Sequence, residues 1–156
     1  MSSRRQKLLD NIGWFVSDSE LEEDLSIDGR ALEKDEFLET LSNIHITWTR
    51  RSSNDDTIIF LYPITNSEKT DNTQIGSVET VKYDSNLLRT ALEVIGAINS
   101  HYYEPINLNN PTSISRISHR GMELLLDGHK SDLLDGNTFG GVELIIPGVY
   151  YVNIEP

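Results

Sequence analysis

The apolar residues near the start of the chain recur at intervals of three and four, the period of an α-helix. The set consists of Leu8, Leu9, Ile12 and Phe15. It predicts a short amphipathic helix at this end of the chain. Ser19 is followed three residues later by Glu22, which matches a capping box. This pair predicts a second, brief helix over residues 20–25.

A tight turn and a longer helix are predicted next. Asp28-Gly29 is a dipeptide typical of turns. Residues 31–41 then place Phe37, Leu38 and Leu41 on one side and carboxylates on the other. The apolar side predicts a helix that packs against the rest of the protein.

After this helix the hydrophobic period changes from about four to two, which indicates strands. Ile44, Ile46 and Trp48 alternate with polar residues and predict a half-buried strand. Residues 57–62 form a more continuous apolar strand that ends at Pro63. A third strand over residues 76–83 would complete an antiparallel meander.

The second half of the chain predicts two helices and a hairpin. Asp84 or Ser85 can cap the first helix. Its apolar stripe, expected to supply most of the core, is Leu88, Ala91, Leu92, Ile95 and Ile98. Residues 113–128 predict the second helix, between a Ser113 cap and Gly128. Residues 142–146 and 149–154 read as two strands joined by Pro147-Gly148.

These elements predict one small α+β domain with N-terminal helices, a short antiparallel meander, two helices and a C-terminal hairpin. An acidic helical segment, residues 1–43, would precede a part spanning 44–156. The order helix, helix, hairpin in this second part is typical of a winged helix. The length of 156 residues fits a single domain.

Four stretches between Phe37 and Leu126 follow one another in a familiar order: FLETLSNIHITW, IIFLYPI, GSVETVKYDSNLLRTALEV and SRISHRGMELLL. This layout resembles the N-terminal winged-helix domain of plasmid replication-initiator (Rep) proteins, over about 90 of the 156 residues. Those initiators are generally basic and contact DNA through a second winged-helix domain. For an acidic chain, the resemblance therefore implies protein contact, including self-association as a homodimer, more readily than DNA binding.

The amino-acid composition and the missing motifs exclude several classes of functional site. The absence of cysteine excludes disulfides, thiolate nucleophiles and sulfur-ligated zinc. No apolar stretch has the length of a signal peptide core or a membrane span, so we expect a cytoplasmic protein without a membrane partner. The motifs of phosphate-binding loops, metalloproteases and serine hydrolases are missing. We therefore expect no catalytic residues, no cofactor and no enzymatic activity. A hydrolase built on carboxylates paired across space and on His101 is a third, less favoured hypothesis.

Metal binding is also not expected. His101 and Glu104 have a spacing that chelates a metal only within a helix, and Pro105 disfavours a helix there. A packed histidine is the favoured interpretation. The adjacent pair Tyr150-Tyr151 must point to opposite faces of its strand, so one ring should be exposed or meet a partner. If that strand is a sheet edge, it can also pair with another chain.

Negative charge is concentrated near the N-terminus. The formal net charge is -12, and residues 17–43 contain ten carboxylates but only two basic residues, Arg30 and Lys34. The carboxylates selected as candidate partner-binding residues are Glu20, Glu22, Glu23, Asp24, Asp35, Glu36 and Glu39. Such a surface either only aids solubility or binds a basic partner, with a charge like that of DNA.

Positive charge is sparse. Arg116, His119 and Arg120 lie on adjacent turns of the predicted helix 113–128, and Arg50 and Arg51 lie in a loop. These residues would read DNA, form salt bridges with the acidic segment, or bind an acidic protein. A DNA footprint usually needs about 6 to 10 phosphate contacts, more than this set supplies.

The favoured hypothesis is a non-enzymatic acidic binding protein that acts through protein-protein contact as an adaptor, regulator or inhibitor. Its partner would be a basic or DNA-binding protein, and proteins of this kind are typical of phages and plasmids, where they act as DNA mimics. The alternative is a single winged-helix DNA-binding protein related to plasmid replication initiators, which would use the basic set named above.

Overall fold

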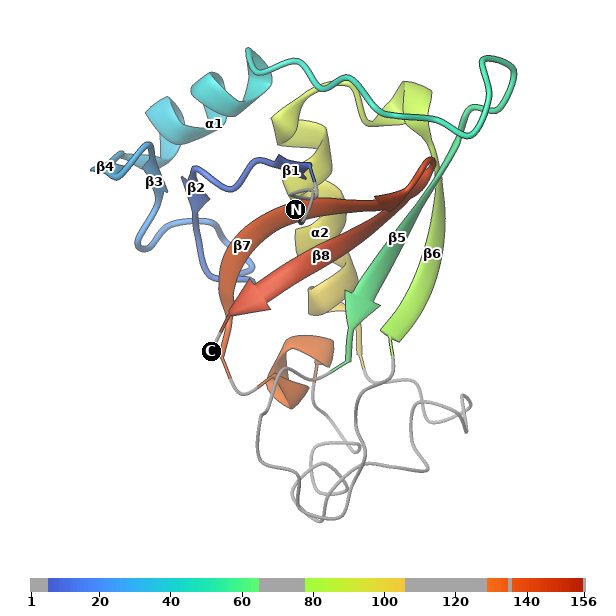
Figure 1. Ribbon diagram of the computed structural model, residues 1–156. Coiled ribbons are helices and arrows are strands. Elements are labelled where there is room, and N and C mark those ends of the chain that lie inside the picture. Colours follow the sequence, from blue (N-terminus) through green and yellow to red (C-terminus); the bar gives the residue numbers. More distant parts are fainter. Residues whose placement is uncertain (1–5, 65–77, 106–128, 135, 156) are drawn as a thin grey trace, which may run out of the picture.

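A computed structural model of the protein describes residues 6–64, 78–105, 129–134 and 136–155. Its main feature is a five-stranded sheet with the strand order β1-β7-β8-β5-β6 (Figure 1). The strands are β1 (Lys7–Leu8), β5 (Thr57–Pro63), β6 (Val78–Asp84), β7 (Thr138–Ile146) and β8 (Val149–Glu155). A smaller sheet contains β2 (Ile12–Gly13), β3 (Ser26–Ile27) and β4 (Arg30–Ala31).

Strand β5 lies inside the large sheet, antiparallel to β6 and parallel to β8. Its side chains alternate: Ile58, Phe60 and Tyr62 are fully buried, while Ile59 and Leu61 on the other face are half-buried. The apolar run therefore forms the predicted strand. The predicted third strand is confirmed as β6 in its described part.

The predicted C-terminal hairpin is confirmed as β7 and β8. Gly148 in its turn has a φ of 85°, a conformation that glycine adopts at little cost. The final strand β8 lies between β7 and β5, so it is not a sheet edge and the condition for its pairing with another chain is not met. Tyr150 is fully buried, whereas Tyr151 on the opposite face is half-buried, as the alternation requires.

Helix α2 (Ala91–Tyr103) covers one face of the large sheet (Figure 1). Its buried residues are Ala91, Val94, Ile95, Ile98, His101 and Tyr102. The predicted apolar stripe is thus largely confirmed, but the predicted cap is wrong. Thr90 and Glu93 form the capping box of α2, whereas Asp84 caps the short 3-10 helix η1 (Ser85–Leu87).

The helix predicted from Leu8 to Phe15 is wrong, because these residues form two short strands separated by a turn. β1 pairs with β7, and β2 pairs with β3. Ile12, Trp14 and Val16 are buried at alternate positions. This two-residue period was present in the sequence and competed with the helical spacing that we followed.

The helix predicted over residues 20–25 is wrong as well. Leu21 and Asp24 have positive φ angles of 52° and 54°, which an α-helix does not contain. The predicted Asp28-Gly29 turn is confirmed, since these two residues connect β3 and β4. The helix predicted over residues 31–41 forms as α1 (Lys34–Ser42). It begins three residues later than predicted, because Ala31 belongs to strand β4.

The strand predicted from Ile44 to Trp48 is also wrong. The backbone of this segment bonds to the start of α2 instead: Ile46 N–H donates to the Arg89 carbonyl oxygen, and Ala91 N–H donates to that of Ile44. Only His45 forms a β-bridge, with Thr90. Trp48 adds an indole hydrogen bond of 2.6 Å to the Leu88 carbonyl oxygen.

The winged-helix prediction is contradicted by this architecture. Within the described ranges, the α-helices are α1 and α2, and strands of two sheets make up most of the remaining regular structure. The segment 1–43 is not helical as a whole, because it contains β1 to β4. The helix predicted over 113–128 lies outside the described residues, and η2 (Lys130–Leu133) follows it. The buried residues form a cluster that extends from Leu9 to Ile154.

Candidate protein-binding surface

The candidate acidic residues are all exposed and belong to two neighbouring elements. One is the acidic loop, residues 18–24, and the other is α1. The Nζ atom of Lys34, the first residue of α1, lies 3.8 Å from Oε1 of Glu22 in the loop. This contact brings loop and helix side by side. We call the set Glu20, Glu22, Glu23, Asp24, Asp35, Glu36 and Glu39 the acidic face.

The acidic loop is organised around the carboxylate of Asp18. This carboxylate accepts backbone N–H hydrogen bonds from Glu20 at 3.2 Å, Glu22 at 2.8 Å and Glu23 at 2.9 Å. Partial burial by itself raises the pKa of Asp18, but these backbone donors outweigh it and lower the pKa below its ordinary value. Asp18 is therefore a structural residue of the loop, while the side chains of its neighbours remain available.

Few carboxylates of the acidic face are neutralised. Glu36 accepts a 2.7 Å hydrogen bond from Arg30, and Glu22 has the longer contact with Lys34. These are the ion pairs of the acidic face among the described residues. Both are exposed, and such pairs contribute only about 0–1 kcal/mol. The structure thus keeps an excess of negative charge at this surface.

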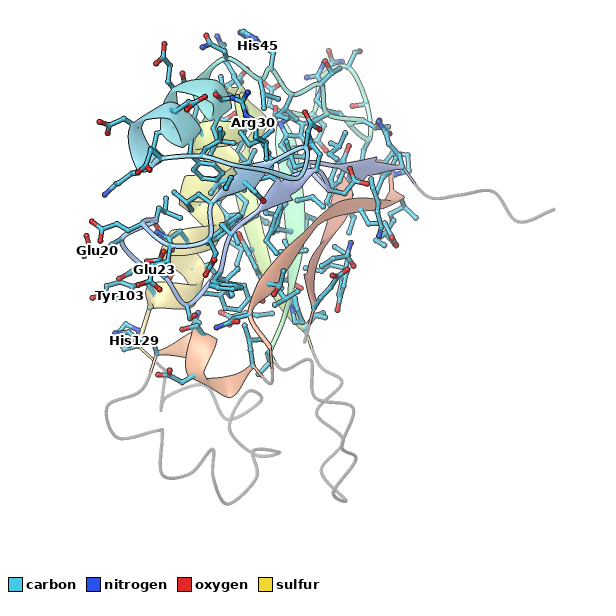
Figure 2. All side chains as sticks on the ribbon, turned by 90° about the vertical axis from the view of Figure 1, so that its left-hand side faces the viewer. Glu20, Glu23, Arg30, His45, Tyr103 and His129 are labelled. Atoms are coloured by element: carbon cyan, nitrogen blue, oxygen red, sulfur yellow. The ribbon has the colours of Figure 1, made fainter. Side chains whose placement is uncertain are left out.

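The acidic loop is attached to the C-terminal half of α2. The side-chain amide of Asn99 donates a 3.3 Å hydrogen bond to the backbone carbonyl oxygen of Ser19. Leu25, which directly follows the loop, is buried in the core. Asn99 and Tyr103 are four residues apart in α2 and therefore lie on the same side of the helix. The loop therefore lies against the side of α2 that carries Tyr103, and Figure 2 shows Glu20, Glu23 and Tyr103 on the same side of the molecule.

Tyr103 forms an exposed aromatic pair with His129. The rings are stacked, with centroids 4.6 Å apart and an interplanar angle of 10°. A β-bridge between Pro105 and His129 holds the two segments together next to the end of α2. Tyr103 remains 54% exposed. Sequence reasoning did not select this pair, although the helical spacing of Asn99 and Tyr103 was available as a signal.

The candidate basic residues that the structure describes are engaged with carboxylates. Arg50 donates a 2.7 Å hydrogen bond to Asp56, and Arg51 donates one of 3.2 Å to Asp55. The remaining candidates, Arg116, His119 and Arg120, lie outside the described residues. No continuous basic surface is assembled from the described members of this set, and DNA binding stays a prediction.

A buried polar cluster lies at the C-terminal end of α2. Lys130 Nζ contacts Glu79 at 2.8 Å and Glu104 at 3.3 Å, and its side chain is only 15% exposed. His101 is buried and stacks on Tyr62, with ring centroids 3.7 Å apart. Burial first, and then the charge of Lys130, lower the pKa of His101 to about 3. The histidine is neutral, so its 4.0 Å separation from Glu79 is not an ion pair.

The tyrosines around His101 complete this cluster. The hydroxyl groups of Tyr62 and Tyr83 share a 2.6 Å hydrogen bond, and the hydroxyl of Tyr102 donates to the Pro63 carbonyl oxygen at 2.7 Å. Burial, followed by the proximity of Tyr83, raises the pKa of Tyr62. The cluster joins β5, β6, α2 and η2, which is a structural role. The interpretation of His101 as a packed histidine therefore agrees with its burial and stacking.

Neither the metal and membrane features of the described residues nor comparisons with known proteins assign a function to this surface. The described part of the chain contains no group of three or more metal-binding side chains that could hold a metal ion. Among the helices that the structure describes, none combines the length and apolar character required to cross a membrane. Comparisons with protein-family models, curated proteins and solved structures found no match. The resemblance to Rep proteins stays a prediction, although the winged-helix arrangement expected from it is wrong.

Proposed function

We propose that this chain is a non-enzymatic binding protein whose acidic face docks a basic surface of a protein partner. The observation that carries the proposal is the arrangement of the acidic loop. The Asp18 carboxylate holds the backbone in place, while Glu20 and Glu23 project outward without a basic partner among the described residues. A fixed backbone reduces the entropy lost on binding, and uncompensated charge attracts a cationic partner.

The test must distinguish binding at the acidic face from a general attraction of cations by the net negative charge of the protein. At physiological ionic strength, the Debye length is about 8 Å, so distant charges contribute little to a local contact. Reversing charges on the acidic face should therefore weaken binding more than reversing the same number elsewhere. Asp56 and Glu155 supply that comparison, because both are exposed and lie outside the loop and α1.

The experiment uses fluorescently labelled hexalysine as the basic probe and measures fluorescence anisotropy at about 0.15 M salt. Three double variants have the same net charge: Glu20→Lys with Glu23→Lys, Asp35→Lys with Glu39→Lys, and Asp56→Lys with Glu155→Lys. We expect the first two to lose about tenfold in affinity, since exposed charge pairs contribute about 0.2–1 kcal/mol each and reversal adds repulsion. The third should stay close to the native affinity.

Equal losses in all three variants, or no loss in any of them, would show that the acidic face is not a binding site. Thermal unfolding of each variant verifies that the fold is retained. Native cell extracts then supply the physiological partner, captured with and without nuclease treatment. If the captured protein is released by duplex DNA, the acidic face competes with DNA, as a DNA mimic would.

A further inference from the structure

The exposed ring pair and the acidic loop form a combined surface. Tyr103 is 54% exposed although it belongs to a helix whose other tyrosine, Tyr102, is buried. His129 covers one face of the Tyr103 ring, with near-parallel planes. Figure 2 shows Glu20, Glu23, Tyr103 and His129 following one another along the same side of the molecule. The aromatic pair and these unpaired carboxylates thus lie on one side of the molecule, and the hydrogen bond between Asn99 and Ser19 attaches the acidic loop to the helix that carries Tyr103.

Lys130, the described basic residue next to His129 in sequence, does not neutralise the carboxylates of Glu20 and Glu23. Its ammonium group contacts both Glu79 and Glu104 and is largely buried. The side chains of Glu20 and Glu23, in contrast, form no ion pair within the described residues. The local charge therefore favours a cationic ligand.

We propose that Tyr103, His129, Glu20 and Glu23 form a binding site for an arginine side chain of the protein partner. The guanidinium group would stack on the Tyr103 ring, and the two carboxylates would accept its N–H hydrogen bonds. This inference rests on the proposed function, because it specifies which basic residue the acidic face binds.

Arginine fits this site better than lysine for two reasons. A guanidinium group is planar, stacks on aromatic rings and donates paired hydrogen bonds to carboxylates. An ammonium group is compact and strongly hydrated, and it gains less from an aromatic surface. A cation-aromatic contact at an exposed site corresponds to about a 2- to 5-fold change in affinity.

The test compares hexaarginine with hexalysine, two probes of equal charge, on the full chain by fluorescence anisotropy. We expect the native protein to bind hexaarginine about 2- to 5-fold more tightly than hexalysine. Tyr103→Leu should abolish this preference, because hexaarginine loses more affinity than hexalysine when the ring is removed. Tyr103→Phe should keep it, because the ring is retained. Leu87→Ala is the control, since Leu87 is an exposed apolar residue, 67% accessible, outside the site.

The outcomes separate the two proposals. If hexaarginine and hexalysine bind equally, or if Tyr103→Leu retains the preference, the arginine site is wrong. In that case the acidic face still stands as long as the Glu20 and Glu23 double variant weakens binding of both probes. If that double variant binds both probes as well as the native protein, the proposed function fails and the arginine site fails with it. Unfolding curves of the Tyr103 variants exclude a loss of structure as the cause.

Discussion

The side-chain amide of Asn99 donates a hydrogen bond to the backbone carbonyl oxygen of Ser19, 3.3 Å away. The two residues are distant in sequence, and this contact joins the acidic loop to α2. The Oδ1 atom of Asn99 is buried without a partner in the described structure. Burying a polar atom without a hydrogen bond costs free energy. The unpaired Oδ1 atom therefore offsets part of the stabilisation that the hydrogen bond to Ser19 provides.

Replacing Asn99 by alanine should loosen the acidic loop. The lost hydrogen bond corresponds to about 0.5–1.5 kcal/mol of unfolding free energy, partly offset by removal of the unpaired oxygen. We expect faster hydrogen exchange at the amides of Glu20, Glu22 and Glu23. Ser100→Ala, an exposed neighbour in α2, is the control and should leave these amides protected. Unchanged exchange in Asn99→Ala would mean that Asp18 alone holds the loop.

Asp18→Ala should destabilise the protein by about 0.5–2 kcal/mol at pH 7, the range measured for lost caps of backbone N–H groups. The pKa of Asp18 is lowered in the folded state, so its stabilisation is present above the unfolded pKa of about 3.9. It is lost as the pH falls through the folded pKa. Urea unfolding at several pH values should show the two proteins converging in acid. Asp10→Ala serves as the control, and an equal effect of that variant would contradict the assignment.

His101 should make the protein less stable in mild acid. Because its pKa is about 3 in the folded state and about 6.5 when unfolded, only the unfolded chain takes up a proton between these values. Stability is therefore fully present above pH 6.5 and falls as the pH approaches 3. The titratable groups that face the ring are Tyr62, Tyr102, Lys130 and Glu79.

His101→Phe retains a ring to stack on Tyr62 but cannot be protonated. The native protein should lose about 2 kcal/mol of unfolding free energy between pH 7 and pH 5 through this group, and the variant should not. The measurement is the difference in unfolding free energy between the two proteins at each pH, which cancels the contributions of groups that both proteins share. A constant difference from pH 7 to pH 5 would show that His101 is protonated in the folded state.

Two glycine substitutions should have opposite signs. Gly148 has a φ of 85°, and an added Cβ would approach Arg51 Cγ to 2.8 Å. Gly148→Ala should therefore lower the unfolding free energy by about 1–2 kcal/mol. Gly96 lies within α2 with nothing within 4 Å of an added Cβ, so Gly96→Ala should raise it by about 0.5–1 kcal/mol. Thermal unfolding of both variants measures this contrast, and destabilisation by Gly96→Ala would reveal close packing at that helix face.

Continuous apolar runs were the most predictable part of the fold. The apolar run of β5 and the hairpin residues of β7 and β8 were correctly predicted to be strands. Each run is short and is bounded by turn residues, which favours a strand over a helix.

The strand predicted from Ile44 to Trp48 failed although its alternation is regular, because its backbone bonds to the segment that begins α2. The helix predicted from Leu8 to Phe15 failed because this short segment satisfies two periods at once. Ile12 fits both the helical spacing from Leu8 and the alternation with Trp14 and Val16, and pairing with β3 selected the strand.

The sequence by itself determined the concentration of carboxylates in residues 17–43, the exposure that charged side chains require, and the apolar stripe of α2. Only the tertiary structure decided which carboxylates have partners and where they lie. The acidic loop lies against α2 because Asn99 bonds to Ser19, and His129 lies beside Tyr103 because Pro105 pairs with His129. Such long-range contacts depend on the packing of the whole core, and local periodicity carries no information about them.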